Sequence, residues 1–272
     1  MSQETLGLIA GNRQLPFLWA ARARAAGFQV AASGFREETD ARLARQVDAF
    51  QLISLGQLGQ LIKFFRAQGV KRAVMQGQIQ HKQIYSSIQA DWRAKWLLAK
   101  QALFIRDFRT EAILGSIAKE LAAQGIRLEP ATWLMEPYLA AKGLQGGPKP
   151  GSKLKRDVEF GLRLTRALTE LDVGQTVVVK RMSCVAVESI EGTDACILRA
   201  AKLAGAGCTV IKLARPKQDL RFDLPVVGPK TFEVLAKAKA GALVVEAGKT
   251  LFLEKDRCLA TADKAGIAVW AV

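Results

Sequence analysis

The chain has 272 residues, half of them hydrophobic, so it can bury one large core or two smaller ones. Its 40 Lys and Arg against 25 Asp and Glu give a net charge of +15, which attracts phosphorylated substrates, nucleic acids or anionic lipid surfaces without choosing among them. A single histidine excludes hydrolases that bind their metal through several histidines, and no apolar run reaches the roughly 20 residues that a membrane-spanning helix needs.

The cysteines indicate a reducing compartment. They lie far apart in sequence and form no C-x-x-C pair, which argues against zinc ligation. They are Cys184, Cys196, Cys208 and Cys258. The first residues lack a basic stretch followed by an apolar run, so we expect no secretory signal and a cytoplasmic protein.

The N-terminal half alternates short apolar runs with amphipathic segments, which predicts a Rossmann-like parallel α/β sheet. The expected strands are residues 5–10, 28–32, 49–55 and 70–76, and the expected helices are residues 16–26, 58–68, 92–108 and 111–124. Trp92, Trp96 and Phe104 recur at helical spacing. We therefore expect these three aromatic side chains to pack in the core.

The C-terminal half predicts a mixed α/β domain. A loop rich in Gly, Pro and Lys covers residues 141–155, and an amphipathic helix follows it. Two hairpins are expected, at residues 175–189 and 242–254, together with strands 209–212 and 267–272 and helices 193–203, 231–240 and 257–265. We therefore divide the chain into domains 1–132 and 133–272.

Two turns follow predicted parallel strands of the N-terminal half. Gly11 and Asn12 end the first strand, and Gly77 and Gln78 end the strand at residues 70–76. Carboxyl ends of parallel strands are where α/β proteins bind ligands, and Gln78 could hydrogen-bond a sugar or uracil. The other interpretation is a pair of tight turns that need glycine for their backbone angles.

Carboxylates surround a glycine in residues 188–194, ESIEGTD. Thr193 or Asp194 could cap the helix that follows. Glu188 and Glu191 are not needed for capping, and clustered carboxylates suit a hard cation such as Mg²⁺.

A Pro-punctuated segment at residues 212–225 carries four cations and two carboxylates. Arg215 and Arg221 could grip a diphosphate, and Lys212 and Lys217 could neutralise it. Asp219 or Asp223 could hold Mg²⁺ or orient water. The alternative is a solvated loop whose charges pair with one another.

An ordered set of motifs resembles one family, the UDP-2,3-diacylglucosamine pyrophosphatases of the LpxI type. The matching stretches run through nearly the whole chain: GLIAGN with LP at residues 7–16, GQ at 77–78, DVGQ at 172–175, VAVESIEGTDA at 185–195, QDLRFDLPVVG at 218–228 and VVEAGKT at 244–250. Arg13 departs from the pattern, because the family usually has glycine there.

The resemblance implies two α/β domains joined by a hinge, with the N-terminal domain closing over a lipid substrate. It implies Mg²⁺-dependent hydrolysis of UDP-2,3-diacylglucosamine to lipid X (2,3-diacylglucosamine 1-phosphate) and UMP, in lipid A biosynthesis. The basic surface fits a peripheral protein at the anionic inner membrane.

The resemblance also assigns residues. A family aspartate in Q-[DE]-x-R-x-D-L-P is catalytic and matches Asp223, with Asp219 and Arg221 in support. Mg²⁺ ligands are expected among Asp223, Glu191 and Asp194. Substrate-binding residues are expected to be Gly11, Asn12, Gly77, Gln78, Gln175, Thr193, Lys212, Arg215 and Gln218.

Two other functions compete with this hypothesis. An RNA-binding protein would share the basic charge, but it calls for exposed aromatics among the basic residues or a known RNA module. The chain has no such module, and Trp92 and Trp96 have the spacing of core residues, so we expect no nucleic-acid partner. A module that binds a nucleotide sugar without catalysis would bind the substrate and release no UMP.

Overall fold

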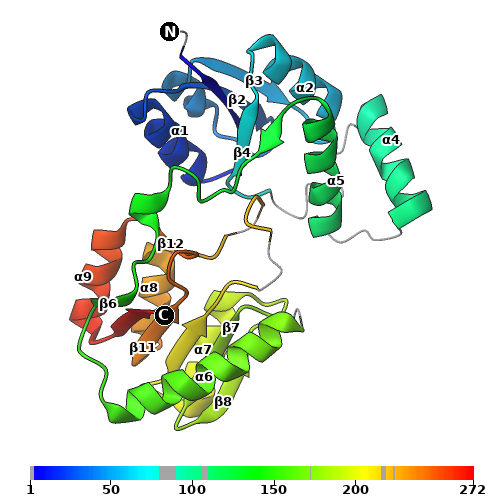
Figure 1. Ribbon diagram of the computed structural model, residues 1–272. Helices are drawn as coiled ribbons and strands as arrows, with labels where there is room; N and C mark the ends of the chain where they lie inside the picture. Colours follow the sequence, from blue (N-terminus) through cyan, green and yellow to red (C-terminus); the bar gives the residue numbers. More distant parts are fainter. Residues whose placement is uncertain (1–2, 80–89, 106–109, 172, 216–218, 223) are drawn as a thin grey trace. The chain divides into compact units, whose positions relative to one another are not determined.

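The computed structural model describes residues 3–79, 90–105, 110–171, 173–215, 219–222 and 224–272. Contacts between residues divide the chain into two compact units (Figure 1). Unit 1 contains Met1–Met135 and Asp219–Asp223, and unit 2 contains Glu136–Gln218 and Leu224–Val272. A short segment of the C-terminal half therefore belongs to the N-terminal unit.

Unit 1 has a five-stranded sheet in the order β3-β2-β1-β4-β5, with every pair parallel. Its strands are β1 (Thr5–Ala10), β2 (Gln29–Phe35), β3 (Ala49–Ile53), β4 (Arg72–Gln76) and β5 (Arg127–Leu128). Its helices are α1 (Leu15–Ala25), η1 (Ala41–Gln46), α2 (Leu58–Ala67), α4 (Trp92–Lys100), η2 (Gln101–Ile105) and α5 (Thr110–Ala123). The predicted Rossmann-like parallel sheet is confirmed.

The central strands of the unit 1 sheet are buried on both faces. One layer contains Phe65 of α2 and Leu121 of α5 packed over Ile9 and Ala31 of the central strands. Trp19 of α1 is also fully buried, and its Nε1–H donates to the backbone oxygen of Trp133 at 2.9 Å. Two-sided burial is why the central strand β1 is almost entirely apolar.

Helix α4 contradicts one expectation. The side chains of Trp92 and Trp96 are 69% and 66% exposed, so their predicted place in the core is wrong. Ala94, Leu97 and Gln101 face unit 1 instead. Helical spacing places residues on a common face, but it does not decide which face packs inward.

Unit 2 has a six-stranded mixed sheet in the order β6-β13-β11-β9-β7-β8. Its strands are β6 (Gly143–Gly146), β7 (Thr176–Lys180), β8 (Ser183–Val187), β9 (Thr209–Lys212), β11 (Ala242–Val245) and β13 (Ala268–Ala271). Strands β9, β11 and β13 are parallel to one another, whereas β7 runs antiparallel to β9 and β6 antiparallel to β13. The predicted mixed α/β domain is confirmed.

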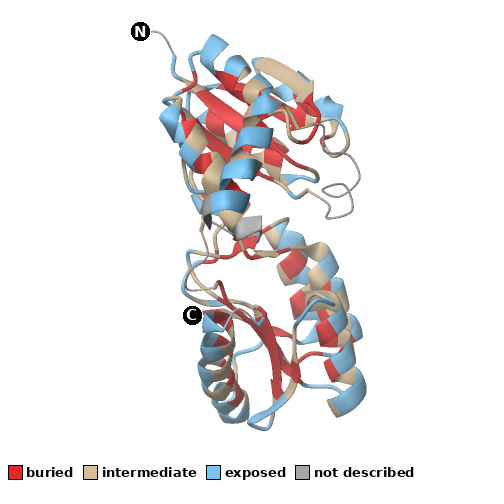
Figure 2. Cartoon of the chain, turned by 90° about the vertical axis from the view of Figure 1, so that its right-hand side faces the viewer, coloured by how far each residue is buried: buried red, intermediate tan, exposed pale blue. Residues whose placement is uncertain are grey.

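Helices cover both faces of this sheet. They are α6 (Ser152–Glu170), α7 (Thr193–Ala204), α8 (Pro229–Lys237) and α9 (Lys255–Ala265), with a short η3 (Glu136–Tyr138) near the start of the unit. Val177 and Val179 of β7 pack with Val158 of α6, whereas Val178 packs with Phe232 of α8. Alternate residues of one strand thus face different helical layers. Figure 2 shows that strands of this sheet are buried.

The first predicted hairpin of this unit is confirmed, since β7 and β8 pair antiparallel. The second is wrong, because β12 (Leu251–Phe252) leaves the main sheet and pairs in parallel with β10 (Val226–Val227). Strand β6 and the start of α6 lie in the predicted 141–155 loop. Glycine-rich β6 has little strand propensity of its own, and pairing with β13 extends it.

Within the described residues, no helix is both long enough and apolar enough to span a membrane.

Candidate functional site

The two glycine turns of unit 1 lie against each other, as expected from adjacent parallel strands. The N–H of Gly11 donates to the oxygen of Gln76 at 2.8 Å, and the N–H of Asn12 donates to the oxygen of Gln78 at 2.9 Å. A Cβ atom on Gly77 would meet the Asn12 oxygen at 2.5 Å, and one on Gly11 would meet the Gln78 oxygen at 2.6 Å. Both turns therefore need glycine to approach this closely.

Asn12 offers a polar group at this edge of the unit 1 sheet. Its Nδ2 donates to Glu38 at 2.6 Å, while its Oδ1 is buried without a hydrogen-bond partner. Gln78 beside it is exposed. Arg13, where the family usually has glycine, adopts a φ of 66°, the left-handed conformation that glycine accepts more readily.

In unit 2, polar residues meet at the edge where β8, β9, β11 and β13 end. Because β7 is antiparallel to β9, its first residue, Thr176, pairs with the last residue of β9, Lys212. The N–H of Glu188 donates to the oxygen of Thr176 at 2.8 Å, which brings the end of β8 to the same place. Gln175 joins this edge through its oxygen, which accepts from the N–H of Leu213 at 3.0 Å.

A chain of hydrogen bonds connects three side chains at this edge. The Nζ of Lys212, a residue only 9% exposed, donates to Oγ1 of Thr193 at 2.8 Å. The Thr193 hydroxyl donates to Oε1 of Glu188 at 2.9 Å. The Thr176 hydroxyl lies 3.3 Å from the Thr193 hydroxyl. We name Lys212, Thr193 and Glu188 the lysine cluster. It joins two predicted substrate-binding residues to a carboxylate.

The capping interpretation of Thr193 and Asp194 is wrong. Helix α7 begins at Thr193, and its N-cap is Gly192, which has no side chain that could cap the helix. The first N–H groups of a helix have no partner within the helix, and they carry its positive dipole end. The start of α7 therefore offers backbone donors for an anion next to the Lys212 ammonium.

The carboxylates around Gly192 differ in their partners. Glu191 is bound by Arg199 and by the N–H of Ser189, and the hydrogen bond from Arg199 keeps the pKa of Glu191 below its ordinary value. Asp194 makes an ion pair with Lys230 at 3.2 Å. Glu188 instead has a buried oxygen, Oε2, that no hydrogen bond engages. Of these three carboxylates, Glu188 is the one with a buried free acceptor.

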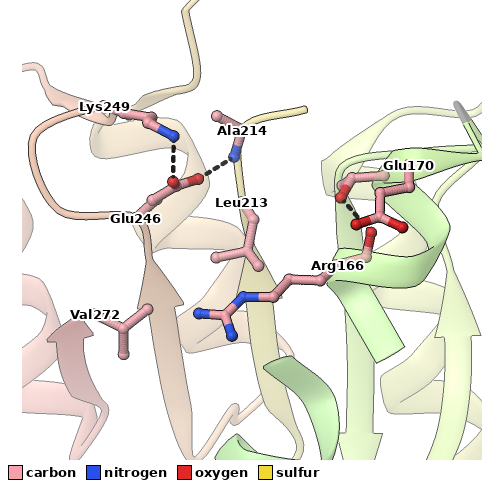
Figure 3. A pocket seen from close by; sticks show the side chains of 8 residues that line it. Arg166, Glu170, Leu213, Ala214, Glu246, Lys249 and Val272 are labelled. Atoms are coloured by element: carbon pink, nitrogen blue, oxygen red, sulfur yellow. Dashed lines mark hydrogen bonds and ion pairs between the residues drawn. The ribbon is translucent and has the colours of Figure 1, made fainter. Parts of the chain in front are cut away.

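A small cavity of about 220 Å³ lies at the same edge, on the α6 side (Figure 3). The Glu246 carboxylate, directly after β11, accepts from the N–H of Ala214 at 3.0 Å and pairs with Lys249 at 2.6 Å. Arg166 extends from α6 toward the ends of β9 and β13, near Glu170 (Figure 3). The sequence did not lead us to predict Arg166, Glu170, Glu246 or Lys249 as site residues. For Glu246 and Lys249 a signal was available, because the VVEAGKT stretch follows a buried strand.

Asp219 and Arg221 lie in unit 1 and bind each other. The Arg221 guanidinium donates to both oxygens of Asp219, with Nη2 at 2.6 Å from Oδ2, and these hydrogen bonds lower the pKa of Asp219. Phe222 packs on the core of unit 1, and the oxygen of Leu220 accepts from the N–H of Ala131 at 2.8 Å. These contacts explain why the segment belongs to unit 1.

Three predicted residues need separate mention. Arg215 follows β9 in unit 2 and is half-buried. Asp223 and Gln218 lie outside the described residues, so their predicted catalytic and binding roles stay predictions.

The described residues contain no group of three His, Cys, Asp or Glu side chains that could hold a metal ion by itself. Mg²⁺ does not need such a group, because it commonly binds through one or two carboxylates together with phosphate oxygens and water. The unengaged Oε2 of Glu188 fits this mode of binding.

Comparison with known proteins covers both units. Residues 5–138 match the LpxI N-terminal domain, and residues 141–270 match the LpxI C-terminal domain. A Caulobacter vibrioides protein named UDP-2,3-diacylglucosamine pyrophosphatase LpxI is 30% identical over 276 residues, which is 98% of this chain and 97% of that protein.

Among solved structures, the biotin carboxylase domain of Hydrogenobacter thermophilus 2-oxoglutarate carboxylase is 13% identical, with a TM-score of 0.30 over 67% of this chain and 36% of that chain. So small a likeness carries no argument. The two domain matches and the Caulobacter relative instead span almost every residue in order. The chain belongs to the LpxI family.

Proposed function

We propose that the chain hydrolyses the diphosphate of UDP-2,3-diacylglucosamine to lipid X and UMP, as a step of lipid A biosynthesis. The observation that carries this proposal is the 30% identity, over 98% of the chain, to a relative named for that pyrophosphatase activity. The geometry of unit 2 is consistent with it, since buried Lys212 and the start of α7 provide positive potential at one edge of the sheet.

Lys212 would bind the diphosphate in this mechanism. The Thr193 hydroxyl, oriented by its hydrogen bond to Glu188, accepts from the Lys212 ammonium group. Little reorganisation is therefore needed as charge builds on the phosphoryl oxygens. Preorganised donors of this kind are usually a large part of catalysis. The free N–H groups at the start of α7 would add to the same stabilisation.

Within unit 2 we propose Glu188, rather than Glu191 or Asp194, as a carboxylate that would hold Mg²⁺. Asp223 keeps the metal-binding role that its sequence motif implies. Glu188 has the unengaged carboxylate oxygen, whereas Glu191 and Asp194 each pair with a cation. When bound, Mg²⁺ would neutralise diphosphate charge and polarise the phosphoryl group. Asp223 would also orient the attacking water or accept its proton.

The glycine turns of unit 1 would bind the uridine or the sugar. Asn12 presents a buried oxygen without a partner, and exposed Gln78 adds an amide next to it. Uracil and glucosamine both offer complementary donors and acceptors to amide groups. The two glycines would let the ligand approach the backbone closely.

We further propose a cytoplasmic chain working at the surface of the inner membrane, where the acylated substrate resides. The net charge of +15 supports this location, because basic proteins are attracted to the anionic cytoplasmic leaflet.

The test measures UMP and lipid X released from UDP-2,3-diacylglucosamine by the purified full chain, with Mg²⁺ and with excess EDTA. We expect product only with the metal. Asp223→Ala should abolish turnover while leaving substrate affinity, measured by calorimetry with detergent-dispersed substrate, largely intact. Asp256→Ala, at an exposed position of α9, is the matched control and should keep full turnover.

The outcomes separate the alternatives. Retained turnover in Asp223→Ala would remove the assignment of that residue. Substrate binding without UMP release under any divalent cation would instead favour a module that binds a nucleotide sugar without catalysis.

A further inference from the structure

The outer face of α4 is an apolar surface in unit 1. Trp92, Trp96 and Leu103 are each about two-thirds exposed, and an open hollow of about 600 Å³ is lined by Trp92, Lys95, Trp96 and Ala99. We name the exposed side chains of Trp92, Trp96 and Ala99 the tryptophan face of α4, and Leu103 lies just beyond it in η2. Large exposed apolar groups in one patch commonly mark a surface that binds another molecule.

The tryptophan face is held in place by the opposite side of the helix. Asp91 caps α4 through the N–H of Ala94 at 2.9 Å and accepts from the N–H of Gly59 at 2.6 Å. Gln101 is fully buried and accepts from the Ser116 hydroxyl at 2.7 Å. These contacts fix the inner side of the helix on unit 1, and the two tryptophans therefore lie on its outer side.

The charged side chains within α4 and η2 are all basic. Residues 92–105 include Arg93, Lys95 and Lys100 and no acidic residue. Arg93 is committed to Glu120 at 2.8 Å and lies over the Trp92 ring at 4.9 Å, so Lys95 and Lys100 are the exposed cations that remain for a partner. An apolar face bordered by lysines is complementary to an anionic surface with an apolar interior.

We propose that the tryptophan face of α4 docks this chain on anionic lipid membranes. Trp is favoured at the membrane interface, where its ring meets acyl chains while its N–H stays near the headgroups. Lysines beside it would meet anionic headgroups. The inference deepens the proposed function and rests on it for its purpose, since it explains how the chain reaches a lipid-linked substrate.

Vesicle flotation of the full chain without substrate tests the docking directly. We expect binding to vesicles that contain phosphatidylglycerol, weaker binding to pure phosphatidylcholine, and loss of binding at high salt. The Trp92→Ala/Trp96→Ala variant should bind at least about tenfold more weakly. The matched control, Leu171→Ala/Leu203→Ala, removes two equally exposed large side chains from unit 2 and should bind normally. Equal binding by the two double variants would overturn the proposal.

Two further measurements identify the contact. Lys95→Gln and Lys100→Gln should each weaken binding about fivefold. Vesicles should shift tryptophan emission to shorter wavelength, and Trp92→Phe/Trp96→Phe should remove that shift although Trp19, Trp133 and Trp270 remain. A shift that persists in this variant would overturn the proposed contact.

Enzyme assays separate this proposal from the proposed function. Trp92→Ala/Trp96→Ala should lower UMP release from substrate embedded in vesicles and leave release from detergent-dispersed substrate unchanged. Vesicle binding through α4 without UMP release from either form would sustain the docking and contradict the hydrolase. UMP release with no vesicle binding would support the hydrolase and contradict the docking.

Other occupants of the tryptophan face would give different results. Sedimentation that shows a dimer broken by Trp92→Ala/Trp96→Ala would indicate a second copy of the chain on this face. RNA retention lost in the same variant, without vesicle binding, would indicate nucleic acid, because exposed aromatics among basic residues also stack on bases. Either result would overturn membrane docking.

Discussion

The Nζ atom of Lys212 lies 2.8 Å from the Oγ1 atom of Thr193, although Lys212 ends a strand and Thr193 begins a helix 19 residues earlier in the chain. The parallel and antiparallel pairing around β9 brings the two residues to one edge of the sheet. Thr193 also donates to Glu188, so the ammonium and a carboxylate are connected through one hydroxyl.

Replacing Lys212 by Met should lower kcat/KM for UMP release by about a hundredfold, because a preorganised positive group near the phosphoryl oxygens is lost. Thr193→Val should have a smaller effect in the same direction, and Thr193→Ser should restore most of the activity, since the hydroxyl positions the ammonium. Lys202→Met removes an exposed cation from the end of α7 and serves as the control. If Lys202→Met and Lys212→Met lower kcat/KM equally, the activity depends on the net charge of the protein and not on the position of Lys212.

The paired glycine turns should tolerate no Cβ atom. Gly77→Ala places a methyl group 2.5 Å from the Asn12 oxygen and forces alanine to a φ of 90°, so it should lower the free energy of unfolding by about 2 kcal/mol or more. In Gly115→Ala, within α5, the added Cβ atom meets nothing within 4 Å, so this variant should raise the free energy of unfolding by about 0.5–1 kcal/mol. Urea denaturation of both variants measures the contrast. Two variants of equal stability would contradict the close approach of the turns.

Asp157 should be essential to the hairpin of unit 2. Its two carboxylate oxygens accept the N–H groups of Arg181 and Met182, at 3.0 and 2.7 Å, and both of these residues have positive φ. Such a turn normally favours Asn-Gly, so the buried carboxylate compensates for unfavourable turn residues. Asp157→Ala should cost about 2–3 kcal/mol of unfolding free energy in urea.

Asp256→Ala is the control for Asp157→Ala, because it removes an exposed carboxylate and should cost less than about 1 kcal/mol. A small cost at Asp157 would mean that water satisfies the turn once the carboxylate is removed.

Glu129 should make the stability of unit 1 depend on pH. Burial raises the pKa of Glu129, but hydrogen bonds from Arg72 and Arg127 outweigh burial, and the pKa lies below its ordinary value. A lowered pKa in the folded state stabilises the fold above the pKa of the unfolded chain. That stability is lost as the pH falls through the lower folded value.

The stability difference between the native chain and Glu129→Gln should therefore be largest at neutral pH and should shrink below pH about 4. Chemical denaturation across this pH range measures it. A difference that stays constant with pH would show that the ionised carboxylate does not stabilise unit 1.

Many features followed from local sequence alone. The alternation of apolar runs with amphipathic segments predicted the parallel sheet of unit 1, because strands buried on both faces must be apolar throughout. The rule that carboxyl ends of parallel strands share an edge placed Gly11 beside Gly77, which the hydrogen bond between Asn12 and Gln78 confirms. The β7–β8 hairpin likewise depends on residues close together in the chain.

Other features were decided only by the tertiary structure. The lysine cluster, the cavity beside Glu246 and the place of Asp219–Asp223 in unit 1 all depend on contacts between distant residues. Threonine is a residue type that often caps helices, yet the Thr193 hydroxyl accepts a hydrogen bond from Lys212 and donates one to Glu188 instead. The tryptophans of α4 have core spacing, yet the helix packs through Ala94 and Gln101. Periodicity determines which side chains share a face of a helix. What that face packs against depends on contacts between distant residues, which a local sequence pattern does not contain.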